Sequence, residues 1–187
     1  MSLQLARYLK MNAALPAGLL EELIGNFTRH ELKEGRYVLR KGQIADSYYF
    51  IESGCFRSFY ICDDKEYTVW IESPGELVCE IKSLRLQQPT DYCMQTLEPT
   101  TYLSIKAAVF DQMVEQHPPL QKFMLRLWET RFMIAVDGMR AFQTLGAKAR
   151  YEYLLNHFPN FEKLSLQQLA NLLGITPSSL SRIRRVK

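Results

Sequence analysis

The chain has 187 residues, of which 47% are hydrophobic and 23% are charged, and its formal net charge is +3. This composition is that of a globular protein able to bury a sizeable core, which excludes a disordered or fibrous chain. The charge is uneven: residues 146–187 hold 7 Lys/Arg and 2 Asp/Glu, a net +5, whereas residues 1–145 hold 16 and 18, a net −2. Such a basic C-terminal segment is typical of a nucleic-acid-binding module attached to a domain with another role.

The chain has no apolar run long enough to span a bilayer, and residues 1–10 lack the apolar core of a signal peptide. We therefore expect a cytoplasmic protein with no membrane partner. Its four cysteines, Cys55, Cys62, Cys79 and Cys93, form no CxxC pair. We interpret them as buried reduced thiols, with a redox-sensing pair or cluster as the alternative.

The first 30 residues show helical apolar spacing, in one piece from Leu3 and in a second over residues 19–27. From Leu32 the pattern changes to short runs of aromatic and β-branched residues separated by turns, among them a hairpin turn at 63–65. The expected strands cover residues 37–39, 48–51, 55–62, 67–71, 91–97 and 101–105. Seven or eight short strands at this spacing predict an antiparallel barrel or jelly roll.

A long helix is predicted from Leu120 to Leu145, after a shorter one over 107–114. Alternating steps of four and three residues select an a/d seam: Leu120, Met124, Leu127, Arg131, Ile134, Gly138, Ala141 and Leu145. Other apolar residues widen the surface beyond this seam, so the helix can pack on its own β domain and on a second copy. We expect a homodimer; the alternative is a helix packed only on its own β domain.

Residues 164–187 predict two short helices joined by a tight turn. Ser165 and Gln168 form a capping box, and Gly174 ends the first helix. Thr176 then caps a second helix with Pro177 at its first position. This is the helix-turn-helix pattern, and a helix over 148–158 precedes it.

The second helix of the pair has a one-sided basic face. Leu180 and Ile183 point toward a core, whereas the other side carries hydroxyl and guanidinium groups without any acid. These groups reach base edges and phosphates in a DNA major groove. The candidate DNA contacts are Thr176, Ser178, Ser179, Ser181, Arg182, Arg184, Arg185 and Lys187. The alternative is an ordinary helical hairpin with a basic end.

In this order of β domain, long helix and helix-turn-helix, the chain resembles the Crp/Fnr family of bacterial transcription regulators over almost its whole length. The residues that carry the resemblance are Gly42, Ala45-Asp46, Tyr49-Phe50-Ile51, Gly54, Pro74-Gly75-Glu76, Leu169-Ala170, Gly174 and Leu180-Ser181-Arg182-Ile183.

The resemblance implies an α+β protein in three parts. An antiparallel β-roll (jelly roll) of the cyclic-nucleotide-binding type with flanking helices is expected over 1–118. A dimerisation helix is expected over 119–145, and a small all-α helix-turn-helix domain over 146–187. The implied partners are double-stranded DNA, a second copy of the chain, a small-molecule effector and RNA polymerase.

Family members that bind cyclic nucleotides carry a Gly-Glu pair and then an Arg-Ser pair. The Glu accepts the ribose hydroxyl, and the Arg neutralises the cyclic phosphate. Here Glu80 matches the Glu, Cys79 replaces the Gly, and Thr90-Asp91 replace the Arg-Ser pair, so we expect no cyclic AMP or cyclic GMP. Two cations remain nearby, which gives the candidate effector residues Cys79, Glu80, Lys82, Arg85, Thr90 and Asp91 and leaves the effector unidentified.

Residues for other family ligands are also missing. Iron–sulfur members use Cys residues near the N-terminus, whereas the first Cys here is Cys55. His30, His117 and His157 fall in predicted helices or at their ends, so neither a haem ligand, a metal site nor a cofactor is expected. A cupin-like enzyme needs His ligands on its strands, and catalysis is therefore not expected. The alternative function is a ligand-binding regulatory module without a DNA-binding role.

The DNA-binding end departs from the family as well. The best-known members begin the recognition helix with an Arg-Glu pair, which Pro177-Ser178 replace here, and only the later Arg182 remains. We therefore expect a different target sequence. The given sequence stops at Lys187 without the family's β-hairpin wing, so phosphate contacts are expected from Arg184, Arg185 and Lys187.

Overall fold

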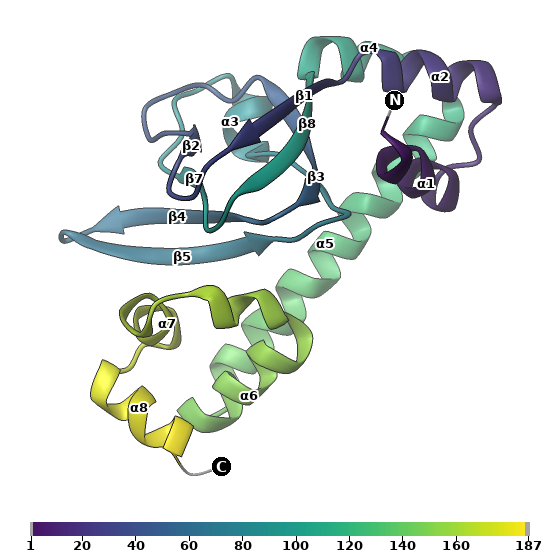
Figure 1. Cartoon of the computed structure of the whole chain (residues 1–187). Helices are drawn as coiled ribbons and strands as arrows, with labels where there is room; N and C mark the ends of the chain where they lie inside the picture. The colour runs from purple at the N-terminus through teal and green to yellow at the C-terminus, as the bar shows by residue number, and fades with distance from the viewer. Residues whose placement is uncertain (1, 186–187) are drawn as a thin grey trace.

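The computed structural model describes residues 2–185. Within this range the strands are β1 (Thr28–Leu32), β2 (Tyr37–Leu39), β3 (Ser47–Ser53), β4 (Phe56–Cys62), β5 (Lys65–Glu72), β6 (Leu77–Val78), β7 (Cys93–Thr96) and β8 (Thr100–Lys106). They form two antiparallel sheets of four strands each, β1-β8-β3-β6 and β2-β7-β4-β5 (Figure 1). The predicted β-roll is confirmed. The closed-barrel alternative is wrong, because no strand among the described residues belongs to both sheets.

Helices flank the sheets and follow them. They are α1 (Leu3–Asn12), α2 (Ala17–Gly25), α3 (Ile81–Leu86), α4 (Ala107–Gln116), α5 (Pro118–Thr144), α6 (Ala147–His157), the 3₁₀ helix η1 (Pro159–Lys163), α7 (Leu166–Leu173) and α8 (Pro177–Arg185). In Figure 1, α1, α2 and α4 lie at one end of the β-roll, and α5 runs from that end to the C-terminal helices. The predicted long helix is confirmed, and it is 27 residues long.

Residues 28–32 form a strand where the sequence predicted the end of a helix. This strand, β1, pairs with β8, and His30 lies opposite Tyr102. The two rings stack with centroids 4.9 Å apart, and His30 Nε2 lies 2.8 Å from Ser104 Oγ. The partner strand is more than 70 residues away in sequence, so apolar spacing within the segment carries no signal for this pairing.

The sequence predicted the turn between β4 and β5 but missed two short elements, β6 and α3. The predicted hairpin turn between β4 and β5 is confirmed: Asp63 and Asp64 both have positive φ, 49° and 57°, as two-residue hairpins require. The short strand β6 and helix α3 were not predicted. They have two and six residues, too few to show a periodicity of their own.

The main hydrophobic core lies between the two sheets and continues under the helices at one end of the roll. Phe50, Ile51 and Phe56 are fully buried in it, together with Phe110 of α4 and Leu120 of α5. At about 25 cal/mol per Å², each such side chain contributes about 2–3 kcal/mol to the free energy of unfolding. The start of α5 is therefore part of the core of the β-roll.

A second core joins the C-terminal helices to the outer face of the sheet β2-β7-β4-β5. Leu169, Ala170 and Leu173 of α7 are buried in it, and so are Cys55 and Ile71 from the β-roll. Helix α7 packs on β5. The apolar side of α7 therefore faces the β-roll and does not point to solvent.

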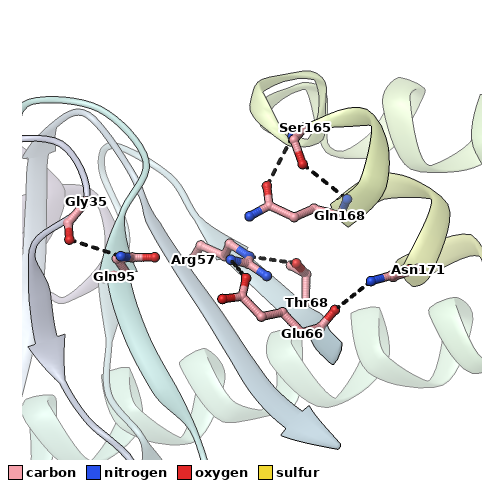
Figure 2. Close-up of polar contacts among 8 residues, drawn as sticks. All are labelled: Gly35, Arg57, Glu66, Thr68, Gln95, Ser165, Gln168 and Asn171. Atoms are coloured by element: carbon pink, nitrogen blue, oxygen red, sulfur yellow. Dashed lines mark hydrogen bonds and ion pairs between the residues drawn. The ribbon is translucent and has the colours of Figure 1, made fainter. Parts of the chain in front are cut away.

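Polar groups complete this contact, as Figure 2 shows. Asn171 Nδ2 of α7 donates to the backbone oxygen of Glu66 over 3.1 Å. The Glu66 carboxylate accepts from the buried guanidinium of Arg57 over 2.7 Å, and Arg57 Nε also donates to Thr68 Oγ1. The Arg57 guanidinium lies 4.1 Å from the ring centre of Phe59. These hydrogen bonds and the ion pair therefore connect β4 to β5 next to their contact with α7.

One glycine of the roll is required for steric reasons. Gly54 has φ 79°, and a Cβ there would lie 2.3 Å from Thr100 Oγ1. Gly42 has φ 88° with nothing within 4 Å of its Cβ position. We expect Gly54→Ala to lower the free energy of unfolding by about 3 kcal/mol and Gly42→Ala by about 1 kcal/mol, since only the first adds a clash to backbone strain. Urea unfolding of both variants measures this, and equal losses would contradict the clash.

Candidate functional site

The capped helix predicted before the turn is present in the structure. Gln168 N–H donates to Ser165 Oγ over 3.2 Å, and Ser165 N–H donates to Gln168 Oε1 over 3.1 Å (Figure 2). Gly174 ends α7 with φ 67°. The N–H of Ser179 donates to Thr176 Oγ1 over 3.2 Å, which caps the start of α8. Helices α7 and α8 thus form the predicted helix-turn-helix.

Helix α8 separates an apolar side from a basic one. Leu180 is fully buried against α6 and α7, and Ile183 is half-buried beside it. On the other side, the guanidinium groups of Arg182, Arg184 and Arg185 are exposed. Among residues 2–185 no carboxylate lies within ion-pair distance of these three arginines. The exposed side of α8 is therefore a basic surface without a neutralising partner.

The other candidate DNA contacts lie around this surface in different environments. Ser178 and Thr176 are exposed, but the Thr176 hydroxyl is already occupied by the cap and by the neighbouring serine hydroxyls. Ser179 and Ser181 are half-buried. Lys187 lies outside the described residues.

Arg184 differs from the other two arginines because a neighbouring helix holds it. Its Nε donates to the hydroxyl of Tyr151 in α6 over 3.2 Å, and its guanidinium lies 5.7 Å from the centre of that ring. A cation fixed in this way contributes a positioned charge at the edge of the basic surface.

A cavity of about 260 Å³ lies between β5, the start of α3 and α5. Its walls include the side chains of Trp70, Glu72, Cys79, Glu80, Trp128 and Arg131. A larger groove of about 650 Å³ lies between α1 and β1 and touches neither α5 nor the C-terminal helices. Of these two, only the smaller is lined by residues of α5.

Glu72 is a buried carboxyl in the wall of this cavity, with only part of its hydrogen-bonding capacity used. Its Oε1 accepts from the Ser58 hydroxyl over 2.7 Å, and its Oε2 has no partner among the described residues. Burial raises the pKa of Glu72 to about 7, while the Ser58 bond and the Arg131 charge lower it and Glu76 raises it. Arg131 donates instead to the Glu76 carboxylate over 3.0 Å. Glu72 is thus a group that titrates near neutrality.

Two of the six predicted effector residues line this cavity, Cys79 and Glu80. The Glu80 carboxylate is the N-cap of α3 and accepts from the backbone N–H groups of Lys82 and Ser83, over 3.2 and 2.9 Å. It is therefore already committed to the helix end.

The other four predicted effector residues lie elsewhere. Lys82 and Asp91 form an exposed ion pair at 4.0 Å. Arg85 pairs with Asp111 of α4 at 2.5 Å, and Thr90 is buried. None of these four lines the cavity, because pairing on the surface and packing inside the roll hold their side chains away from it; their contact with an effector stays a prediction.

The cavity residues that the sequence did not single out include Ser58, Trp70, Glu72, Tyr92 and Trp128. Trp70 and Glu72 alternate along β5, so a period of two places them on one face of a strand. Nothing in the sequence says which face of that strand is hollow. Arg131 was predicted, but as a member of the dimer seam.

Most of the predicted seam on α5 faces the protomer's own interior. Leu120 and Met124 are buried in the roll core, and Leu127 packs against it. Arg131 is bound to Glu76, and Ala141 is buried near the far end. Ile134, Gly138 and Leu145 are half-buried. The first half of the seam is therefore not available to a partner, and the exposed apolar side chains of α5 are Leu125, Phe132, Met133, Val136 and Met139.

The four cysteines are free thiols in different environments. Cys55 and Cys93 are buried and Cys79 is half-buried, but Cys62 is exposed at the end of β4, so the prediction of buried thiols is wrong for it. Burial raises the pKa of Cys55 to about 11 and that of Cys79 to about 12. Both thiols are therefore protonated near neutral pH, which makes them poor redox nucleophiles.

Metal-ligating residues do not gather in one place. His30 lies in β1 and not in a helix, His117 lies between α4 and α5, and His157 ends α6. Within residues 2–185 there is no group of three His, Cys, Asp or Glu side chains placed to hold a metal ion. Nor does any helix in this range have both the length and the apolar composition needed to cross a membrane.

Known proteins match both the β-roll and the part of the chain that follows it. A family model described as a cyclic nucleotide-binding domain matches residues 29–117, which cover the whole β-roll and α4. The transcriptional activator protein Anr of Pseudomonas protegens is 24% identical over 168 residues, covering 81% of this chain and 67% of that protein. The chain is therefore similar to transcription regulators of the Crp/Fnr type in the β-roll and in the part that follows it. The curated relative matches well beyond the β-roll, because its aligned part is almost twice as long as the domain model.

Solved structures share the fold of this chain at low identity. FixK2 from Bradyrhizobium japonicum superposes with a TM-score of 0.73 at 14% identity, over 86% of this chain and 83% of that one. A structure described as a putative transcriptional regulator of the crp/fnr family, from Eubacterium rectale, gives 0.73 at 16% identity, over 96% and 87%. Both comparisons cover more of the chain than the β-roll and its flanking helices hold.

The buried carboxyl gives a pH-dependent stability. Glu72 holds its proton more tightly in the folded chain, where its pKa is about 7, than in the unfolded chain at 4.5. Its contribution is therefore fully present below about pH 4.5 and is lost as the pH rises to about 7. We expect Glu72→Gln to gain about 2–3 kcal/mol in the free energy of unfolding over the unmodified chain between about pH 5 and about pH 8. Denaturant unfolding at both pH values tests this, and a gain independent of pH would contradict it.

Proposed function

We propose that this chain is a transcription regulator of the Crp/Fnr type that binds a two-fold DNA site as a homodimer and responds to a small molecule in the β-roll cavity. The basic surface of α8 is the single observation that carries the proposal. A solvated helix face mixes charges of both signs, whereas this one presents three exposed guanidinium groups and no acid. Its place after the capped helix α7 and the Gly174 turn is that of a recognition helix.

The roles of the three arginines follow from their environments. Arg182 is exposed in the middle of α8 next to Ser178 and Ser181, so it is the candidate for bidentate contacts to a guanine edge. Arg184, fixed on Tyr151, and Arg185, at the end of α8, are candidates for phosphate contacts.

Dimerisation is proposed through the exposed apolar side of α5. Leu125, Phe132 and Met139 recur every seven residues and are 60–70% exposed. Met133 and Val136 widen this stripe. A repeat of seven residues is the spacing at which two helices pair along a continuous seam. Parallel pairing of two α5 helices places both copies of α8 at the same end, as two half-sites about 34 Å apart on DNA require.

Coupling between the cavity and α8 is proposed through Trp70 and α5. The Trp70 side chain lines the cavity, and its ring also contacts the Phe158 ring after α6, with centroids 5.5 Å apart. Trp128 and Arg131 place α5 itself in the cavity wall. A ligand there contacts both the connection to the C-terminal helices and the proposed dimer helix, so it biases the arrangement of the two recognition helices.

The cavity is unsuited to a cyclic nucleotide. Its only lining cation is Arg131, which is bound to Glu76. The carboxyl groups of Glu72 and Glu80 are also in its wall and repel a cyclic phosphate. Calorimetric binding of cyclic AMP at micromolar concentration would contradict this part of the proposal.

Gel-shift titration with DNA tests the main proposal. We expect Arg182→Ala to lose about 1–3 kcal/mol of preference for the specific site, because a base contact disappears. Arg185→Ala should weaken binding to all sequences and reduce the salt slope by about one. Binding that is undetectable even at low salt would overturn the DNA-binding role and leave a ligand-binding regulatory module.

The dimer surface has a test of its own. Phe132→Glu places a charge in the middle of the exposed stripe, so we expect the dimer to dissociate about 100-fold more readily. Thr130→Glu is the matched control, because residue 130 is also exposed on α5 but lies on a different side of the helix. Light scattering over a concentration series measures both. A monomeric unmodified chain at micromolar concentration, or equal effects of the two variants, would contradict this surface.

A further inference from the structure

We propose that the cavity of the β-roll binds a small organic cation, such as a quaternary ammonium or amine, between aromatic side chains and the carboxyl group of Glu72. This assignment rests on the proposed function, because it names the class of effector for the same cavity.

The charges around the cavity favour a cation. Two carboxyl groups, Glu72 and Glu80, line it, and the single lining cation, Arg131, is neutralised by Glu76 outside the wall. Glu80 is used to cap α3, which leaves Glu72 as the group free to meet a ligand. A positive charge in this cavity is therefore attracted by the wall, and a phosphate or carboxylate is repelled.

Glu72 also has an atom without a partner. Its side chain is buried, only 6% of the residue is exposed, and Ser58 occupies Oε1 alone. Its Oε2 and the indole Nε1 of Trp70 are both buried without a hydrogen-bond partner among residues 2–185. Unpaired buried polar atoms are costly, and an amine N–H can donate to Glu72 Oε2, whereas a hydroxyl such as that of choline can accept from Trp70 Nε1.

Aromatic rings supply the second part of the site. Trp70 from β5, Tyr92 from the segment before β7 and Trp128 from α5 all line the cavity. The faces of Trp and Tyr rings attract cations, and cages of such rings are a known solution for quaternary ammonium groups. The volume of about 260 Å³ lies below the range of about 300–1,000 Å³ common for drug-sized ligands, so a compact ligand fits best.

The titration of Glu72 makes the affinity depend on pH. The charged or titratable groups that face it are Arg131 of α5, Glu76 of the β5–β6 turn, and Cys79 and Glu80 before α3. Ionised Glu72 attracts a cation and protonated Glu72 does not, so affinity for a permanent cation rises with pH through neutrality.

The test compares choline and benzyltrimethylammonium with 3,3-dimethylbutan-1-ol, the neutral carbon analogue of choline, on the full chain. The chain has two tryptophans, and both line the cavity, so intrinsic fluorescence reports this site directly. We expect choline to bind at least about tenfold more tightly than the neutral analogue near pH 8, and this preference to shrink toward about pH 6.

Two variants and one control separate charge from packing. Glu72→Gln should abolish the preference for choline over its neutral analogue. Trp128→Leu should weaken choline binding by calorimetry while Glu72 stays in place, which covers the case that Glu72→Gln does not fold. Glu34→Gln removes the same charge from an exposed position between β1 and β2 and should leave choline binding unchanged.

Equal affinity for choline and the neutral analogue, or no response to either ammonium probe, would overturn the cation assignment. Gel-shift titration of the same samples separates this failure from failure of the proposed function. DNA binding without ammonium binding leaves the regulator and removes only the ligand class, whereas absence of DNA binding overturns the regulator whatever the probes do.

Discussion

The alternation of side chains along β5 is the constraint on which the rest of this molecule depends. Ile71 points to the outer face of its sheet, where it shares a core with α7 and the other C-terminal helices. Its neighbours Trp70 and Glu72 line the cavity on the other side. One strand therefore forms both the seat of the C-terminal helices and the wall of the candidate effector site. A ligand that displaces Trp70 or Glu72 in the cavity therefore acts on the same strand that carries Ile71 into the core shared with α7.

Helix α5 has an equivalent double role. Its beginning is buried in the core of the β-roll, and its middle supplies Trp128 and Arg131 to the cavity. The adjacent side of the helix carries the exposed stripe that includes Phe132. Because residues four apart lie on neighbouring positions of a helix, a ligand that moves Trp128 also moves the proposed dimer surface. The proposed effector site and the proposed dimer surface thus lie on the same turns of the helix.

The pairing of Arg131 with Glu76 determines which ligands this arrangement accepts. Without Glu76, the guanidinium would give the cavity a cation suited to an anionic ligand. With Glu76 bound at 3.0 Å, the net charge of the wall comes from Glu72. In our proposal, a fold that matches the cyclic nucleotide-binding domain is thus combined with a cavity that favours a cation.

The sequence by itself determined the features that are encoded within a few residues of each other. Ser165 with Gln168, Gly174, and Pro177 fixed both helices of the helix-turn-helix, since caps and turns depend on local hydrogen bonds and backbone angles. Six of the eight strands described for the roll and the length of α5 also followed from local periodicity. Only the tertiary structure decided that Glu72 lines a cavity, that Arg131 faces inward, and that His30 lies in a strand. These depend on which face of an element meets which neighbour, and that choice is made by contacts between segments far apart in the chain.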